Sequence, residues 1–132
     1  MFIAGKIFLW LPVLIHMGII YYFSSQPAGS PTLEGFPVPA ALGHFVGYFI
    51  LGGLLYRAFA GGVDRWYGYA AMMAVTVAVL YGIFDEIHQS FVPGRDSSVL
   101  DVLINAWGIV TAVAVIRLFV YLLHGMGKKK ET

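Results

Sequence analysis

The residues best able to do chemistry gather in one short stretch, DEIHQSFVPGR, at positions 85–95. This stretch combines two carboxylates, an imidazole and a guanidinium between two apolar runs. On a helix, Asp85, His88 and Gln89 are spaced i, i+3, i+4 and share a face, while Glu86 projects about 100° away. Carboxylates and imidazoles serve general acid–base catalysis and bind divalent metals. We therefore place the centre of any functional site here.

Two other apolar runs carry polar side chains at a comparable depth. His44 lies just inside the start of one run, with Tyr48 one helical turn further on, and Asp101 and Asn105 are one turn apart in another. A polar stripe in a membrane helix should face the bundle interior, because polar groups are costly in lipid. We therefore expect these residues to converge with the acids of the opening stretch. His16 lies deeper and has no polar company, so we interpret it as structural.

The two adjacent acids require compensation. Asp85 and Glu86 would lie at the C-terminal end of a helix, where the helix dipole disfavours carboxylates by about 0.3–1 kcal/mol each. Arg95 follows a Pro-Gly pair that favours a type II turn, so it can fold back toward that helix end. It would either pair with one of the acids or present its fork of donors to a phosphate or carboxylate.

The same residues also have structural interpretations. An interfacial polar cap in contact with water would account for residues 85–89, and an isolated salt bridge would account for Arg95. Ser98 and Asp101 have the spacing of a capping box with Asp in place of Glu, and Asp96 suits a helix N-cap. Taken alone, Asp101 is therefore a helix-start residue, and its alignment with Asn105 is the argument for a further role.

The composition shows what kind of scaffold must position these groups. The chain has 132 residues, which suits one domain over 1–132, and it contains no cysteine. Apolar residues make up 59%, charged residues only 11%, and the mean hydropathy is +0.79. Because so few charges cannot cover the surface of a soluble domain of this size, the chain is predicted to lie in a membrane.

Four apolar runs are each close to the roughly 20 residues that a helix needs to cross a bilayer. Lipid offers no partner for free backbone groups, so the four runs should be helices. The first resembles a signal peptide in following Lys6, but bulky Tyr21 and Tyr22 and the lack of a small-residue cleavage site favour a retained span. The predicted fold is an all-α integral membrane protein, a bundle of four transmembrane helices at about 7–23, 40–60, 67–87 and 100–123.

The basic residues fix the expected orientation. Seven of the eight would lie on one side of the membrane, against Arg95 alone on the other. Basic residues mark the cytoplasmic side. Both termini are therefore predicted to be cytoplasmic and the stretch at 85–95 to face outside. The seven residues are Lys6, Arg57, Arg65, Arg117, Lys128, Lys129 and Lys130.

The connections differ in character. The segment 24–39 holds four of the six prolines, and we predict no regular helix or strand in it. The connection at 61–66 is expected to be a simple turn. Residues 124–132 should form a polar basic tail that holds the last helix to the anionic leaflet. Three lysines in that tail do not indicate a nucleic-acid partner.

The polar motifs resemble those of the VanZ-like family of small bacterial integral membrane proteins. The resemblance covers essentially the whole chain, through YYFSSQP, GHFVGYFILGGLLYR and YGIFDEIHQSFVPGRDSSVLDVLINAWG. Gly43 stands where many members carry a lysine or another polar residue. The resemblance implies a site in the cell envelope at the cytoplasmic membrane, since the family is associated with teicoplanin resistance, and it does not supply a reaction. The positions that fall on the family's motifs are Ser24, Ser25, Gln26, His44, Asp85, Glu86, His88, Gln89, Arg95, Asp101 and Asn105.

Two hypotheses from different classes follow. An enzyme would hydrolyse or transfer a group on an envelope lipid or lipid-linked precursor, with catalysis by His44, Asp85, Glu86, His88 and Asp101. A binding or regulatory protein would recognise the same ligand without changing it. In both, the substrate would be held by Ser24, Ser25, Gln26, Tyr48, Gln89, Arg95 and Asn105. A variant of the enzyme hypothesis adds a divalent metal on Asp85, Glu86, His88 and Asp101. A channel or carrier is disfavoured, because the ionisable groups gather at one face of the membrane.

Overall fold

The computed structural model describes residues 2–35 and 38–128, and the described chain is helical without strands. The helices are α1 (Phe2–Ser24), α2 (Pro31–Glu34), α3 (Ala40–Ala60), α4 (Gly68–Gln89) and α5 (Val99–Lys128). Four of them are long and apolar enough to cross a membrane, over Gly5–Ser24, Ala40–Ala60, Gly68–Gln89 and Val99–His124. The prediction of an all-α protein with four membrane-spanning helices is therefore confirmed.

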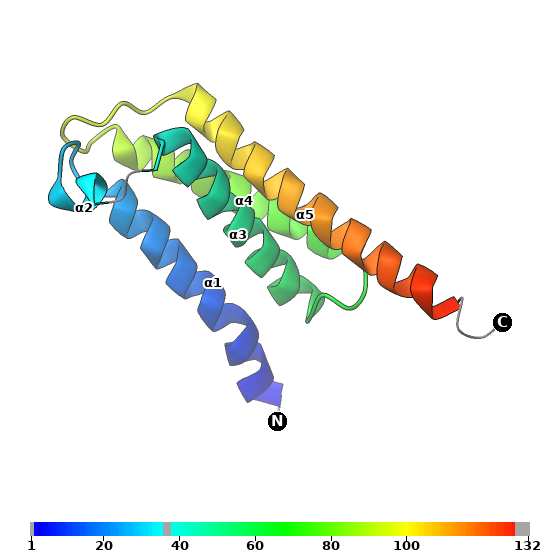
Figure 1. The fold of residues 1–132 in the computed structure, drawn as a ribbon. Coiled ribbons are helices and arrows are strands. Elements are labelled where there is room, and N and C mark those ends of the chain that lie inside the picture. Colours follow the sequence, from blue (N-terminus) through cyan, green and yellow to red (C-terminus); the bar gives the residue numbers. More distant parts are fainter. Residues whose placement is uncertain (1, 36–37, 129–132) are drawn as a thin grey trace.

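The four long helices alternate in direction (Figure 1), so the two ends of the bundle differ. One end carries the start of α1, the end of α5 and the short connection between α3 and α4. The other end, which we call the loop end, carries α2 and the connections 25–39 and 90–98. Helix α3 packs against α1, α4 and α5 and so forms the centre of the bundle, whereas α1 lies against α3 and, to a lesser extent, α4.

Small residues allow the helices to approach closely. Helix α4 buries Ala70, Ala74, Ala78 and Gly82, which recur every fourth residue and form one strip along the helix. In membranes, close packing of such small residues replaces the hydrophobic effect as a source of helix association. Against this strip lie large buried side chains of α3 and α5, chiefly Tyr48, Leu51, Leu55, Tyr56 and Ile109.

The long first connection contains a helical turn that the sequence interpretation excluded. Helix α2 covers Pro31–Glu34, and the hydroxyl of Ser30 accepts a hydrogen bond from Leu33 N at 3.4 Å. Proline at the first helical position costs no hydrogen bond, because that N–H has no partner within a helix anyway, and its fixed φ suits the helix. The prediction of no regular helix over 24–39 was therefore wrong at this point.

The connection between α4 and α5 contains the predicted turn, but α5 begins further along the chain than an N-cap at Asp96 would require. Gly94 has φ +73°, and Arg95 N donates to Val92 O at 3.2 Å, as expected for a type II turn. Helix α5 starts at Val99, so Ser98 caps it and the prediction of Asp96 as N-cap was wrong. At the other end of the chain, α5 continues through the predicted basic tail as far as Lys128. The remainder of that tail, 129–132, lies outside the described residues.

Candidate functional site

The buried polar side chains of the described chain lie close to the loop end of the bundle. Ser24 ends α1, Asn105 lies about two turns into α5, and the other three are in the last turn and a half of α4. Only 3% of Asp85, 5% of Glu86 and 1% of Asn105 is exposed. Ionisable groups buried in a membrane bundle are costly and usually serve a function. We therefore examine this cluster as the candidate site.

The packing strip of α4 explains why the acids point inward. Glu86 is four residues beyond Gly82 and continues the strip of small residues that faces α3 and α5. Asp85 lies beside it, one residue earlier, and is equally buried. The period-four strip of small residues is the sequence signal that places Glu86 inside the bundle.

Asp85 is held in a chain of hydrogen bonds that leads to the arginine. Its Oδ2 accepts from the hydroxyl of Tyr48 at 3.2 Å and from Gln89 Nε2 at 3.3 Å. Gln89 Oε1 in turn accepts from Arg95 Nη2 at 2.8 Å. Within the described residues Arg95 forms no ion pair with Asp85 or Glu86. Arg95 is therefore linked to Asp85 indirectly, by hydrogen bonds through the carboxamide of Gln89.

Glu86 is satisfied on one oxygen alone. Its Oε2 accepts from the backbone N–H of Ser98 at 3.2 Å, whereas Oε1 is buried without a hydrogen bond and lies 3.7 Å from His44 Nδ1. His44 Nδ1–H donates to Asn105 Oδ1 at 3.1 Å, which leaves Asn105 Nδ2 buried without a partner. Since buried polar atoms normally have partners, these two unpartnered atoms beside His44 are the ones available to a ligand atom.

Asp101 forms its hydrogen bonds at the start of its own helix, with Ser98. Its backbone N–H donates to Ser98 Oγ at 3.1 Å, which is the N-cap half of the predicted capping box. The other half is absent, because Asp101 Oδ2 accepts from the hydroxyl of Ser98 at 2.7 Å and the Ser98 N–H donates to Glu86. Ser98 therefore connects Asp101 to Glu86 through one residue. Sequence reasoning placed Ser98 only in the capping box and missed this contact with Glu86.

His88 turns toward α1 and away from the cluster of His44, Asp85 and Glu86. Its ring stacks on Tyr21 with 4.7 Å between centroids, and its Nε2 lies 3.0 Å from Ser25 Oγ. The Ser25 hydroxyl donates its proton to Tyr21 O at 2.7 Å. Nε2–H of His88 is therefore the donor to Ser25. In this arrangement the imidazole orients the serine and does not act as its base.

Two further predicted substrate-binding residues, Ser24 and Gln26, lie at the end of α1 and just beyond it. Gln26 donates from Nε2 to Tyr22 O at 3.1 Å, and the hydroxyl of Ser24 is buried without a hydrogen-bond partner. The predicted residues thus fall into two groups. The central cluster comprises His44, Tyr48, Asp85, Glu86, Gln89, Arg95 and Asn105, with Asp101 attached through Ser98, and the α1 group comprises Ser24, Ser25, Gln26 and His88.

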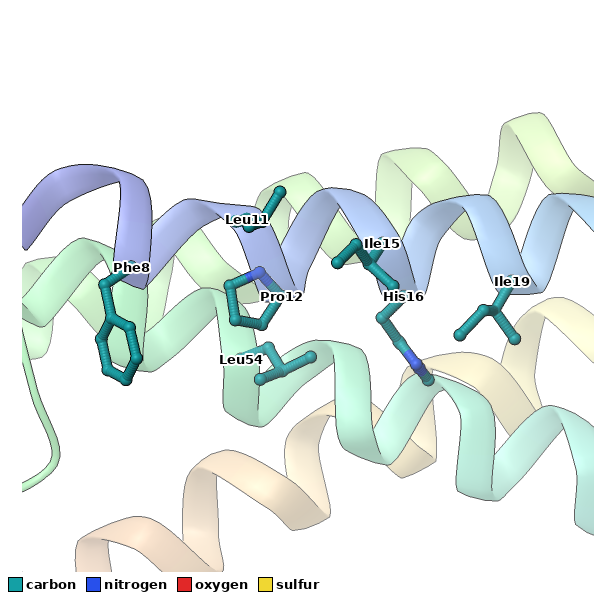
Figure 2. A pocket seen from close by; sticks show the side chains of 7 residues that line it. All are labelled: Phe8, Leu11, Pro12, Ile15, His16, Ile19 and Leu54. Carbon is teal, nitrogen blue, oxygen red and sulfur yellow. The ribbon is translucent and has the colours of Figure 1, made fainter. Parts of the chain in front are cut away.

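A groove between α1 and α3 is lined almost entirely by apolar side chains. It has a volume of about 400 Å³ and lies between α1 and α3 (Figure 2), lined by Phe8, Leu11, Pro12, Ile15, His16, Ile19 and Leu54. The imidazole of His16 donates from Nε2 to Gly47 O at 2.8 Å, in line with the structural interpretation of this residue. The groove is therefore an apolar surface of the helix pair.

The second groove reaches the polar cluster. It lies between the end of α4 and the start of α5, has a volume of about 270 Å³, and includes Glu86 among its lining residues. We call it the α4–α5 groove. Its other lining residues are Ile83, Ile87, Ser90, Ser97, Ser98, Val99 and Val102.

Fold and site together define a class, a small multi-pass α-helical membrane protein with a buried polar cluster at one end of its bundle. The family model described as VanZ/LLP1 matches residues 8–120, and the chain belongs to this family. The family resemblance seen in the sequence motifs is thus confirmed. A search of curated proteins found no match. A search of solved structures also found none.

Proposed function

We propose that the α4–α5 groove and the cluster behind it bind the polar head of an envelope lipid or lipid-linked precursor. The observation that carries this proposal is the two-sided lining of the groove. Ile83, Ile87 and Val99 are 40%, 57% and 78% exposed and offer an apolar wall, while serines and Glu86 offer a polar one. A lipid has the same division, so its chain would lie along the apolar wall with its head against the hydroxyls and the carboxylate.

The charges at the loop end suit a phosphorylated head group. Arg95 is half-buried and donates to Gln89 from one nitrogen, and in the described part of the chain it has no ion pair. A guanidinium has five N–H donors, so others are available for phosphate oxygens, which it binds bidentately. The acids Asp85 and Glu86 would accept hydrogen bonds from hydroxyl or ammonium groups of the same head.

The distribution of basic residues supports an outward-facing site in the bacterial cytoplasmic membrane. The end of the bundle opposite the loop end carries four basic residues, Lys6, Arg57, Arg65 and Arg117. The loop end carries Arg95. By the positive-inside rule the loop end faces outside. A head-group site there would suit the role in teicoplanin resistance that the family resemblance implies.

A second candidate function is hydrolysis or group transfer on the same lipid. The observation that favours it is the pair of His44 and Glu86, with 3.7 Å between Nδ1 and Oε1 at the inner end of the groove. His44 would act as general base, Glu86 would orient it, and Arg95 would stabilise negative charge that develops on a phosphate. Binding alone needs the same residues but leaves the ligand unchanged.

Blocking the groove tests the binding proposal. Val102→Trp would fill the α4–α5 groove, and Leu11→Trp makes the same kind of change in the apolar groove between α1 and α3. Both variants and the wild type would be purified in mild detergent and analysed for bound lipid by native mass spectrometry. We expect the wild type and Leu11→Trp to retain a lipid that Val102→Trp loses. Equal retention, or equal loss, in the two variants would refute the groove as the binding site.

A further inference from the structure

Three side chains with metal-binding atoms converge behind the α4–α5 groove. His44 of α3 and Asp85 and Glu86 of α4 each offer one donor atom, and the three atoms lie within 4.8 Å of one another. Both acids are buried, and His44 is half-buried. An imidazole and two carboxylates form a ligand set common to several divalent metals.

The charge of this group is not balanced by the protein. Two adjacent carboxylates are buried, and the nearest guanidinium, that of Arg95, is attached to Gln89. Among the described residues the ion pairs are His44 with Glu86 and an exposed pair at the opposite end of the bundle. A buried carboxylate is costly unless a positive partner neutralises it. One divalent cation would neutralise both acids at once.

An independent observation indicates where that cation would sit. Glu86 Oε1 is buried, without a hydrogen bond, and lies 3.7 Å from His44 Nδ1. With metal–ligand bonds of about 2.0–2.2 Å, neighbouring ligand atoms are about 3.0–3.5 Å apart, so a shift of a few tenths of an ångström would bring both atoms onto one ion. Glu86 Oε1, which accepts no hydrogen bond from the protein, is thus the oxygen that a metal would bind.

The surrounding hydrogen bonds orient the carboxylates as metal sites require. The hydroxyl of Tyr48 and the carboxamide of Gln89 hold Asp85, and the backbone N–H of Ser98 holds the second oxygen of Glu86. Such outer contacts fix ligating groups and affect metal affinity strongly. They leave His44 Nδ1 and Glu86 Oε1 facing each other.

We propose that His44, Asp85 and Glu86 bind a divalent transition metal, Zn²⁺ or Mn²⁺. His44 would coordinate through Nδ1 and carry its proton on Nε2, so metal binding would replace the hydrogen bond from Nδ1–H to Asn105 Oδ1. Three protein ligands leave a coordination position open, as in catalytic metal sites, and Glu86 borders the α4–α5 groove. The ligand set differs from the one that the sequence suggested, which included His88 and Asp101. In the structure His88 is hydrogen-bonded to Ser25 and Asp101 to Ser98. The proposed site stands on ligand geometry and does not depend on the lipid proposal.

Metal binding would be measured on the full chain in detergent, after tag removal and dialysis against EDTA. Equilibrium dialysis with Zn²⁺ and with Mn²⁺ would give the stoichiometry and affinity of the wild type, of Glu86→Gln and of His44→Gln. His88→Gln, at the same end of the bundle, and His16→Gln, in α1, are the controls. We expect one Zn²⁺ or Mn²⁺ per chain, at least ten-fold weaker binding in the first two variants, and less than two-fold change in the controls.

Two results would overturn the site: binding of neither Zn²⁺ nor Mn²⁺ by the wild type in equilibrium dialysis, or equal weakening in the controls. Gel filtration would show whether each variant is folded. If Glu86→Gln and His44→Gln do not fold, pulsed EPR of the Mn²⁺-loaded wild type decides the question. We expect coupling to an imidazole nitrogen, and a spectrum without it would also overturn the proposal. Lipid retention in the groove-blocking variant is a separate readout, so the two proposals can fail independently.

Discussion

Replacing Gly108 by alanine should separate α5 from α3. A Cβ at this position would lie well inside the van der Waals contact distance to Phe45 O and 3.0 Å from Phe49 N. Both are backbone atoms of α3, so no change of rotamer relieves the overlap. Restoring ordinary contact distances requires the helices to move apart by about 0.5 Å or more. Because the contact lies next to His44 and one turn from Asn105, the movement would also stretch their hydrogen bond.

The expected loss of stability follows from two opposing effects. Overpacking a well-packed interior costs about 1–3 kcal/mol, and overlap with backbone belongs at the upper end of this range. Alanine also favours a helix over glycine by about 1 kcal/mol, which leaves a net loss of about 2 kcal/mol for Gly108→Ala. Gly53→Ala is the matched control, because a Cβ there meets nothing within 4 Å and keeps the helix-propensity gain. The two variants should therefore differ by about 3 kcal/mol.

Reversible unfolding in mixed micelles of a mild detergent and dodecyl sulfate, followed by circular dichroism, would measure this difference. A Gly108→Ala protein as stable as Gly53→Ala would contradict the close approach of α3 and α5. A variant that is destabilised yet keeps metal and lipid binding would instead show that the loop end tolerates the movement.

Three further outcomes are expected. In intact cells, a membrane-impermeant reagent should label Gly35→Cys but not Asp64→Cys, and the reverse pattern would refute the outward loop end. Tyr56→Phe removes a hydroxyl that bridges two backbone groups of the turn between α3 and α4 at 2.8 and 3.0 Å. It should lower the unfolding free energy by about 1–3 kcal/mol without changing lipid retention, and an unchanged stability would show that the bridge is dispensable. Arg95→Lys keeps the charge but loses the planar fork, so the protein should stay stable and lose bound phospholipid, and full lipid retention would exclude a bidentate phosphate contact.

The architecture was predictable from sequence because lipid leaves few alternatives. Apolar runs close to bilayer thickness must be helices, and the four spans follow from that requirement. The inward position of Glu86 also has a local signal, the small residues at every fourth position of α4. The N-cap at Ser98 and the turn before Arg95 follow from residue types whose local geometry is strongly restricted.

The arrangement within the site depends on contacts between distant segments. His88 shares its helical face with Asp85, yet its ring stacks on Tyr21 of α1 and bonds Ser25, the residue after α1. The link from Arg95 to Asp85 through Gln89 likewise depends on how the turn folds over the helix end. Helical periodicity determines which residues share a face, but it does not determine which neighbouring helix supplies their partners.

The central claim, that the cluster at the loop end serves an envelope lipid, is tested most directly by an unbiased profile of lipids and lipid-linked precursors. Membranes from cells with and without the protein would be compared, together with cells that carry Asp85→Asn. We predict that the protein changes the level of a particular envelope lipid and that Asp85→Asn abolishes the change. A product that accumulates only with the wild type would favour the enzyme over the binder. Identical profiles in all three membranes would contradict the account.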